Sequence, residues 1–210
     1  MARRNTRTQR APARLIPTQP VRVDPVGPGV VLTSRMTLRP LNSGDRGAFV
    51  EAVDAARLAL ERWMPIHEEG EDDHALFDRQ LRLTEEGESR GTAFRRVGVL
   101  ADGTIAGAFN LTTIERGLDF HAEANWWVRP EFSGQGLGAE GVGALADHAL
   151  RPPPAGLGLH SVSAWIIPNN TASERLAERL GFQKQGGSTE LRRVGGDRWI
   201  RHALYQLQAA

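Results

Sequence analysis

The chain of 210 residues contains no cysteine. This excludes a disulfide scaffold, a thiolate metal site and a cysteine nucleophile. No apolar run is long enough to cross a bilayer, and the arginine-rich start has no apolar segment of the kind found in secretory signals. An excess of one charge is also absent, because 26 basic residues nearly balance 25 acidic ones, so no overall field favours nucleic acid. We therefore expect a soluble, cytoplasmic protein that binds neither nucleic acid nor a membrane directly.

The chain divides into a tail and one domain. Residues 1–29 are rich in Arg, Pro and Thr and poor in core-forming residues, which is typical of a flexible basic tail. A basic arm that contacts RNA or a ribosome is the alternative, and the lack of interleaved aromatic residues favours simple solvation. Residues 30–210 are long enough for one domain with a full core and short for two.

Alternating and β-branched stretches predict strands along this domain. Residues 30–41 predict a strand pair or one bent strand, and Asp102-Gly103 is a strong hairpin signal between two further strands. Gly195-Gly196 marks a terminal hairpin. The other predicted strands cover residues 92–100, 104–114, 119–128, 160–167, 182–194 and 198–207.

Apolar residues at spacings of three and four predict four helices. The first runs to about Trp63 with Ser43 or Asp45 as its cap, and the second covers roughly residues 72–86. The third follows a glycine-rich loop and runs to about Leu150. The fourth starts at Asn169 or Asn170 and is closed by a glycine, Gly181. This order of elements predicts an α/β (α+β) fold with a mixed sheet, and excludes a doubly wound sheet of repeated βαβ units.

The glycine-rich loop has the spacing GxGxxG, formed by Gly136, Gly138 and Gly141. Glycines before a helix suit phosphate, because backbone N–H groups can approach closely at the positive end of the helix dipole. A dinucleotide site also needs an acidic residue at the end of the next strand, and the segment WIIPNN has none. A surface turn remains the alternative. However, Gly141 and Gly143 each cost about 1 kcal/mol against Ala inside a helix, which calls for a reason.

Two longer segments then point to a family. The segment AEANWWVRPEFSGQGLGAEGVGALADHAL, followed by IPNNTASERLAERLGF, resembles the GNAT superfamily of N-acetyltransferases. Within it, the chain is similar to the Rim-type branch, which acetylates N-terminal amines of ribosomal proteins. The early segment LTSRMTLRPLNSGDRGAFVEAV resembles the opening strand and helix of that branch. The resemblance covers residues 32–207 and implies a single GNAT-like domain whose twisted sheet is mostly antiparallel and flanked by helices.

The resemblance also implies a binding site for acetyl-CoA as cosubstrate, without a metal. Backbone groups around Trp127 and Val128 would pair with the pantetheine arm, and Asn170 and Ser173 would lie near the thioester. Ser133 stands where the family usually has Arg or Gln, and can still donate its hydroxyl to phosphate. The amides expected to cradle the pyrophosphate follow Ser133 and Gly134: they belong to Gln135, Gly136, Leu137, Gly138 and Ala139.

The implied reaction is direct attack of an amine on the thioester in a ternary complex. Such a reaction needs a proton acceptor for the amine and a proton donor for the leaving sulfur. Ser173 is the predicted donor. Glu123 is the first predicted acceptor, because it lies two residues from Asn125 on the same strand face; Glu190 and His121 are weaker alternatives. An exposed, merely charged strand residue is the plain alternative for Glu123.

The acceptor is less constrained than the cofactor. The Rim resemblance implies a protein or peptide α-amine, with a ribosomal protein N-terminus as one possibility. A small amine such as an antibiotic or polyamine, or an acyl-CoA sensor without turnover, are the alternatives. Trp63 is predicted beside the acceptor groove, Trp127 and Trp165 in the core, and the acidic run at residues 68–73 as a surface that draws cationic amines. A monomer and a homodimer are both compatible with the sequence.

Overall fold

The computed structural model describes residues 29–194 and 198–209. Except for Gly29, the predicted tail of residues 1–29 lies outside the described residues, and so does the predicted turn at Gly195-Gly196. No helix in the described ranges is long and apolar enough to cross a membrane.

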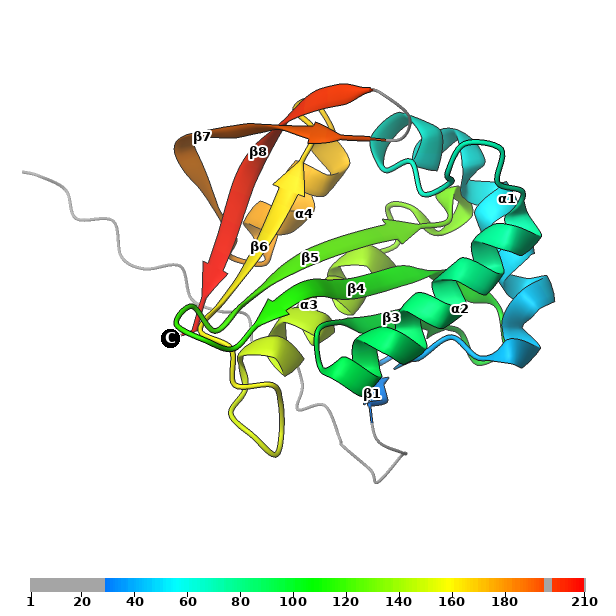
Figure 1. Cartoon of the computed structure of the whole chain (residues 1–210), viewed down its shortest axis with the longest axis horizontal. Coiled ribbons are helices and arrows are strands. Elements are labelled where there is room, and N and C mark those ends of the chain that lie inside the picture. Colours follow the sequence, from blue (N-terminus) through cyan, green and yellow to red (C-terminus); the bar gives the residue numbers. More distant parts are fainter. Residues whose placement is uncertain (1–28, 195–197, 210) are drawn as a thin grey trace, which may run out of the picture.

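One mixed sheet organises the domain (Figure 1). Its strand order is β1-β2-β3-β4-β5-β6-β8-β7. Every neighbouring pair is antiparallel except β5 and β6, which are parallel. The strands are Val31–Leu32 (β1), Thr37–Arg39 (β2), Phe94–Val99 (β3), Ile105–Glu115 (β4), His121–Val128 (β5), Ser161–Ile166 (β6), Gln183–Arg193 (β7) and Trp199–Gln208 (β8). The predicted α/β class and mostly antiparallel sheet are confirmed.

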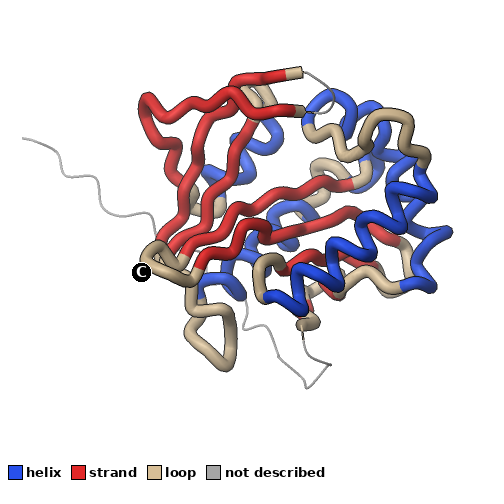
Figure 2. The backbone as a smooth tube through the Cα atoms, in the orientation of Figure 1, coloured by secondary structure: helices blue, strands red, loops and turns tan. Residues whose placement is uncertain are grey.

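Four α-helices accompany the sheet in the described part of the chain (Figure 2). They are Arg46–Trp63 (α1), Asp73–Arg90 (α2), Leu137–Leu150 (α3) and Thr171–Arg179 (α4). The short 3-10 helices Ser43–Asp45 and Pro130–Phe132 precede α1 and the glycine-rich loop.

The second helix is longer than predicted. Its N-cap is Asp72, whose side chain accepts a hydrogen bond from the backbone of Ala75, and it ends at Gly91 in the left-handed conformation. The sequence predicted this helix only over roughly residues 72–86. In the structure Gly87 lies inside the helix, where a Cβ would come within 2.7 Å of the Cβ of Ala93. This glycine therefore serves a close contact and not a helix end.

The sheet separates two apolar clusters. On one face, α1 and α2 pack through Phe49, Val53 and Leu76 against Val97 and Trp127. The cluster on the other face contains residues of α3 and α4, together with Phe109 of β4 and Ala164 of β6. Alternation along each strand decides the face: in β5, Trp127 belongs to the first cluster and Ala122 and Ala124 to the second.

The central strands β5 and β6 separate after a short paired segment. They pair only from His121↔Ser161 to Glu123↔Ser163. Beyond Glu123, β5 keeps its pairing with β4 as far as Val128, while its other edge has no strand partner among the described residues. Figure 1 shows the two strands diverging. The glycine-rich loop starts near the end of this open edge, so the fold brings an unpaired strand edge and a helix N-terminus together.

Candidate active site

A cavity of about 1080 Å³ occupies the region where β5 and β6 diverge. The first helix and the glycine-rich loop both contribute to its lining, as do the start of α4 and the ends of β7 and β8. Nearly all the sequence-predicted site residues line it: Glu123, Trp127, Val128, Ser133, Gly134, Gly136, Gly138, Ala139, Asn170 and Ser173. The side chain of Gln135 instead donates to the backbone carbonyl of Glu131, and that of Leu137 is buried in the core.

The loop presents free backbone donors. Gly134 and Gly136 have φ values of +75° and +84°, a left-handed conformation that glycine adopts without strain. From Gly136 to Ala139, no backbone N–H has a backbone acceptor within the described ranges. These donors stand at the N-terminus of α3, where the helix dipole adds positive potential. Both features suit a phosphate group.

The loop is fixed from the side by the turn between β1 and β2. Glu140, in the first turn of α3, accepts hydrogen bonds from the hydroxyl of Thr33 at 2.6 Å and from Nε of Arg35 at 2.7 Å. Arg35 also donates to the carbonyl of Gln135 at 2.8 Å. Burial opposes ionisation of Glu140, but these hydrogen bonds outweigh it and lower its pKa. The ionised Glu140 therefore holds the loop in place.

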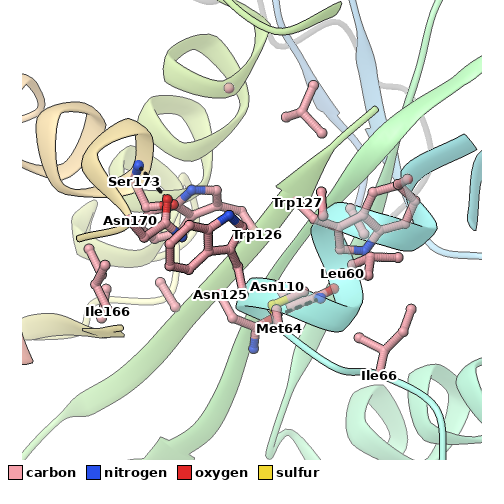
Figure 3. A pocket seen from close by; sticks show the side chains of 18 of the residues that line it. Leu60, Met64, Ile66, Asn110, Asn125, Trp126, Trp127, Ile166, Asn170 and Ser173 are labelled. Carbon is pink, nitrogen blue, oxygen red and sulfur yellow. Dashed lines mark hydrogen bonds between the residues drawn. The ribbon is translucent and has the colours of Figure 1, made fainter. Parts of the chain in front are cut away.

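Asn170 and Ser173 meet at the start of α4. Asn170 is the N-cap, and its Oδ1 accepts a hydrogen bond from the backbone N–H of Ser173 at 3.3 Å. The Nδ2 of Asn170 and the hydroxyl of Ser173 have no partner in the part of the chain that the structure describes. Figure 3 shows both residues beside the ring of Trp126. The cap leaves these two groups available to a ligand.

Glu123 lines the cavity in a tight network. Its Oε1 accepts from Nη1 of Arg192 and from Nε1 of Trp165, both at 3.1 Å, and its Oε2 accepts from Nη2 of Arg192 at 2.8 Å. Among the described residues it is the one acidic side chain that lines the cavity. Trp165 was predicted in the core; it is only partly buried and lines the cavity, because its indole N–H bonds Glu123. Trp127 is buried, with 9% of its surface exposed.

The two weaker candidates for proton acceptor lie elsewhere. His121 bonds the hydroxyls of Ser161 and Ser163 at 3.0 and 2.9 Å and does not line the cavity. Glu190 is exposed on β7. A histidine that sequence reasoning missed does line the cavity.

This histidine is His202, on β8. Its Nδ1 lies 2.8 Å from the carbonyl of Ile200, so Nδ1 carries the proton and Nε2 keeps its lone pair. Burial lowers the pKa of His202 below 6.5, so the ring is neutral at pH 7. No sequence signal singled it out, because its position depends on how β8 folds back beside β6.

The acidic run does not form part of the cavity wall, although Glu71 bonds the lining residue Arg79. Glu71 is paired with Arg79 at 2.6 Å, and Asp73 with Arg57 at 2.6 Å. Asp72 caps α2. None of the acidic residues at 68–73 lines the cavity. Trp63, in contrast, does line it; its place beside the acceptor stays a prediction.

In the described part of the chain, the other charged residues that line the cavity are all arginines: Arg79, Arg95, Arg96, Arg175, Arg179, Arg192 and Arg193. The side chain of Arg96 points to the opposite face of the sheet, where it lies over the ring of Phe94. Arg175 and Arg179 are exposed, one turn apart on α4, and the spacing i, i+4 on a helix opened by Asn170 could have indicated a second phosphate-binding surface.

The fold and this cavity define a class: a protein in which an open strand edge and the free backbone donors of a helix start share one cleft. Residues 35–183 match the acetyltransferase (GNAT) domain family. The chain belongs to this family and is a GNAT N-acetyltransferase.

Individual proteins are similar to the chain in sequence and in fold. The chain is 26% identical over 178 residues to the ribosomal protein uS5-alanine N-acetyltransferase of Escherichia coli, which covers 83% of this chain and 88% of that protein. Its fold is similar to that of RimJ from Mycobacterium smegmatis, solved in complex with a CoA-disulfide, with a TM-score of 0.75, 24% identity and 87% and 88% of the two chains covered. It is also similar to RimL, a ribosomal L7/L12 alpha-N-protein acetyltransferase solved with coenzyme A, with a TM-score of 0.74, 16% identity and coverage of 86% and 98%.

Proposed function

We propose that this protein transfers the acetyl group of acetyl-CoA to the N-terminal α-amine of a protein or peptide. The observation that carries the proposal is the meeting of unpaired N–H donors at residues 136–139 with the open edge of β5 in one cavity. The first suits a pyrophosphate, and the second suits an amide-containing arm that extends the sheet. The similarity to ribosomal protein N-acetyltransferases supports the acceptor class.

The residues present fit acetyl-CoA. Ser133, the amide of Gly134 and the amides from Gly136 to Ala139 would hold the pyrophosphate, with Arg175 and Arg179 near enough to the same cavity to pair with further phosphates. The predicted amide of Gln135 already donates to the carbonyl of Phe132 at 3.4 Å. Backbone groups of Trp127 and Val128 would bond the pantetheine arm. Bound acetyl-CoA supplies an activated acyl group as a thioester. A cytoplasmic location remains a prediction.

The chain's own residues then manage charge and protons. A backbone N–H near Val128 is placed to bond the acetyl oxygen as negative charge develops on it. The amine nitrogen would form the new C–N bond and lose a proton to the acceptor side chain, and the C–S bond would break. The hydroxyl of Ser173 would donate a proton to the departing sulfur and regain one, through water, from the acceptor side chain. Asn170 orients the reacting groups through its free Nδ2. Holding both substrates in one cavity makes the step effectively intramolecular.

Two side chains of the cavity can accept the amine proton. Glu123 is the proposed acceptor from the sequence, and it acts directly or through water. His202 is the alternative that the geometry favours, because its Nε2 has no hydrogen-bond partner in the described ranges, whereas both oxygens of Glu123 already accept hydrogen bonds.

A small-amine acceptor is the second candidate. The fold is also similar to a chimera of the spermidine N-acetyltransferase SpeG, with a TM-score of 0.62 and 20% identity. The arginine-rich cavity wall opposes a polycation such as spermidine.

The test is a thiol-release assay with acetyl-CoA and a panel of N-terminal peptides, polyamines and aminoglycosides. We expect release with peptides, and mass spectrometry should place the acetyl group on the α-amine. Release only with small amines would overturn the acceptor class. Binding of acetyl-CoA without release on any acceptor would support a sensor instead.

A further inference from the structure

Arg95 occupies an unusual place in the cavity wall. It lies on β3, opposite Asn110 of β4, which lies opposite Asn125 of β5. The three side chains therefore form one row across the sheet. Their neighbours at i±2, Val97, Ala108 and Trp127, pack beneath α1 and α2, so alternation places the row on that same face, and all three residues line the cavity.

The charge of Arg95 has no counter-ion. Its Nε is buried and has no hydrogen-bond partner, the one such side-chain atom among the described residues. No carboxylate of the described chain forms an ion pair with it. Its neighbours differ: Arg79 pairs with Glu71, Arg96 with Glu88 and Arg192 with Glu123. Burial, and then the charge of Arg79, lower the pKa of Arg95. A partly buried guanidinium with a buried, unbonded Nε and no counter-ion is costly, which calls for a ligand.

The asparagines add donors to the same row. The backbone N–H of Arg96 donates to Oδ1 of Asn110, so Asn110 must donate through Nδ2, and Oδ1 of Asn125 accepts that bond at 3.0 Å. Figure 3 shows the two amides joined in this way. This order leaves Nδ2 of Asn125 without a partner in the described part of the chain. Arg95 and the Nδ2 of Asn125 therefore offer unused donors to the cavity.

We propose that Arg95 binds a carboxylate of the acceptor, namely the side chain of Asp or Glu at the second or third residue of an N-terminal peptide. This rests on the proposed function. Neighbouring strands lie 4.7–4.9 Å apart, so Arg95 on β3 is roughly 10 Å from Asn125 on β5, beside the open edge. An extended peptide advances about 3.3 Å per residue. A carboxylate two residues beyond the reacting amine, carried on its own side chain, spans that distance, and the α-carboxylate of a free amino acid does not.

The guanidinium matches this ligand chemically. Its planar N–H groups can bond both oxygens of a carboxylate, which a lysine ammonium cannot do. The free Nδ2 of Asn125 is placed to donate to a backbone carbonyl of the same peptide. Glu123 does not compete for Arg95, because its two oxygens accept from Arg192 and Trp165.

The experiment compares KM values of the full chain at saturating acetyl-CoA. The acceptors are short peptides that differ only in Glu, Gln or Lys at the second or at the third residue, together with free glutamate. We expect KM for the Glu peptide to be at least about tenfold lower than for the Gln peptide at one of the two positions. Arg95→Gln should abolish this preference and leave KM for the Gln peptide within about twofold, and Arg95→Lys should retain part of it.

The matched control is Arg82→Gln, which removes the same charge from an exposed position on α2 outside the cavity and should keep the full preference. Thermal melting checks the fold of each variant; loss of a partly buried charge that has no counter-ion should not lower the Tm of Arg95→Gln. Equal KM values for Glu, Gln and Lys peptides would overturn the role of Arg95 and leave the proposed function standing. Arg95-dependent turnover of free glutamate alone would overturn the peptide ligand. No turnover on any acceptor would overturn both proposals.

Discussion

Two glycines of α3, Gly141 and Gly143, allow a test of whether glycine is needed there for helix packing or for phosphate binding. A Cβ at Gly141 would lie 2.4–2.7 Å from three ring atoms of Phe109, whereas a Cβ at Gly143 would meet nothing closer than 3.4 Å, a side-chain atom of Leu180. Neither glycine lines the cavity. Gly141→Ala and Gly143→Ala should therefore differ in stability and not in affinity for acetyl-CoA.

The magnitude follows from two opposing effects. Each substitution gains about 1 kcal/mol of helix propensity, and this gain cancels when the two variants are compared. Gly141→Ala alone forces a methyl group into the ring of Phe109, and such overpacking costs about 1–3 kcal/mol. For a domain of this size, 1 kcal/mol corresponds to about 2–4 °C in Tm, so we expect Gly141→Ala to melt roughly 2–12 °C below Gly143→Ala.

The assay is thermal melting followed by circular dichroism, with chemical unfolding as a check. Gly143→Ala should melt at or above the parent protein. In a Phe109→Leu background the penalty of Gly141→Ala should shrink, because the ring that causes it is gone. Equal Tm values for the two single variants would refute the packing explanation and return Gly141 to the phosphate loop.

The remaining predictions concern catalysis and pH. Ser173→Ala should lower kcat by about 10²–10⁴-fold with acetyl-CoA binding retained; calorimetry and thiol release measure the two, and unchanged turnover would remove the proton-donor role. If His202 accepts the amine proton, kcat/KM should fall as the pH drops through the lowered pKa of His202, below 6.5. His202→Gln should remove this pH dependence, and Glu123→Gln should keep it. The reverse result would make Glu123 the proton acceptor. Burial also lowers the pKa of His148, so the unfolded chain binds protons more readily than the folded one, and stability should be full above pH 6.5 and decline as pH falls below it. His148→Gln should flatten that decline in urea titrations, and an unaltered slope would contradict it.

Much of the fold could be predicted from local signals. The hairpin at Asp102-Gly103 is present, with Gly103 at φ +89°, because that pair favours a tight turn over most alternatives. Asn170 caps α4 as its side chain suggests. The end of α2 was predicted too early: the helix continues past Gly87, whose close contact with Ala93 depends on tertiary packing that local patterns do not show.

The site could be predicted only where its residues lie close together in the sequence. The loop residues and Asn170 with Ser173 belong to two compact motifs, so their positions follow from sequence. The row of Arg95, Asn110 and Asn125 depends on the register of three strands, which local patterns do not fix. The partner of Glu123 is likewise Arg192, 69 residues away along the chain. Charges that meet only across the sheet are therefore the part that sequence reasoning missed.

The most direct test of coenzyme A binding at the glycine-rich loop is calorimetric titration of the full chain with acetyl-CoA, with NADH as the control ligand. We expect saturable 1:1 binding of acetyl-CoA and no binding of NADH. Gly136→Val should bind acetyl-CoA more weakly, because a β-branched side chain at a left-handed φ distorts the donor loop. Binding of NADH without acetyl-CoA, or acetyl-CoA binding that Gly136→Val leaves unchanged, would contradict the assignment of this loop to coenzyme A phosphates.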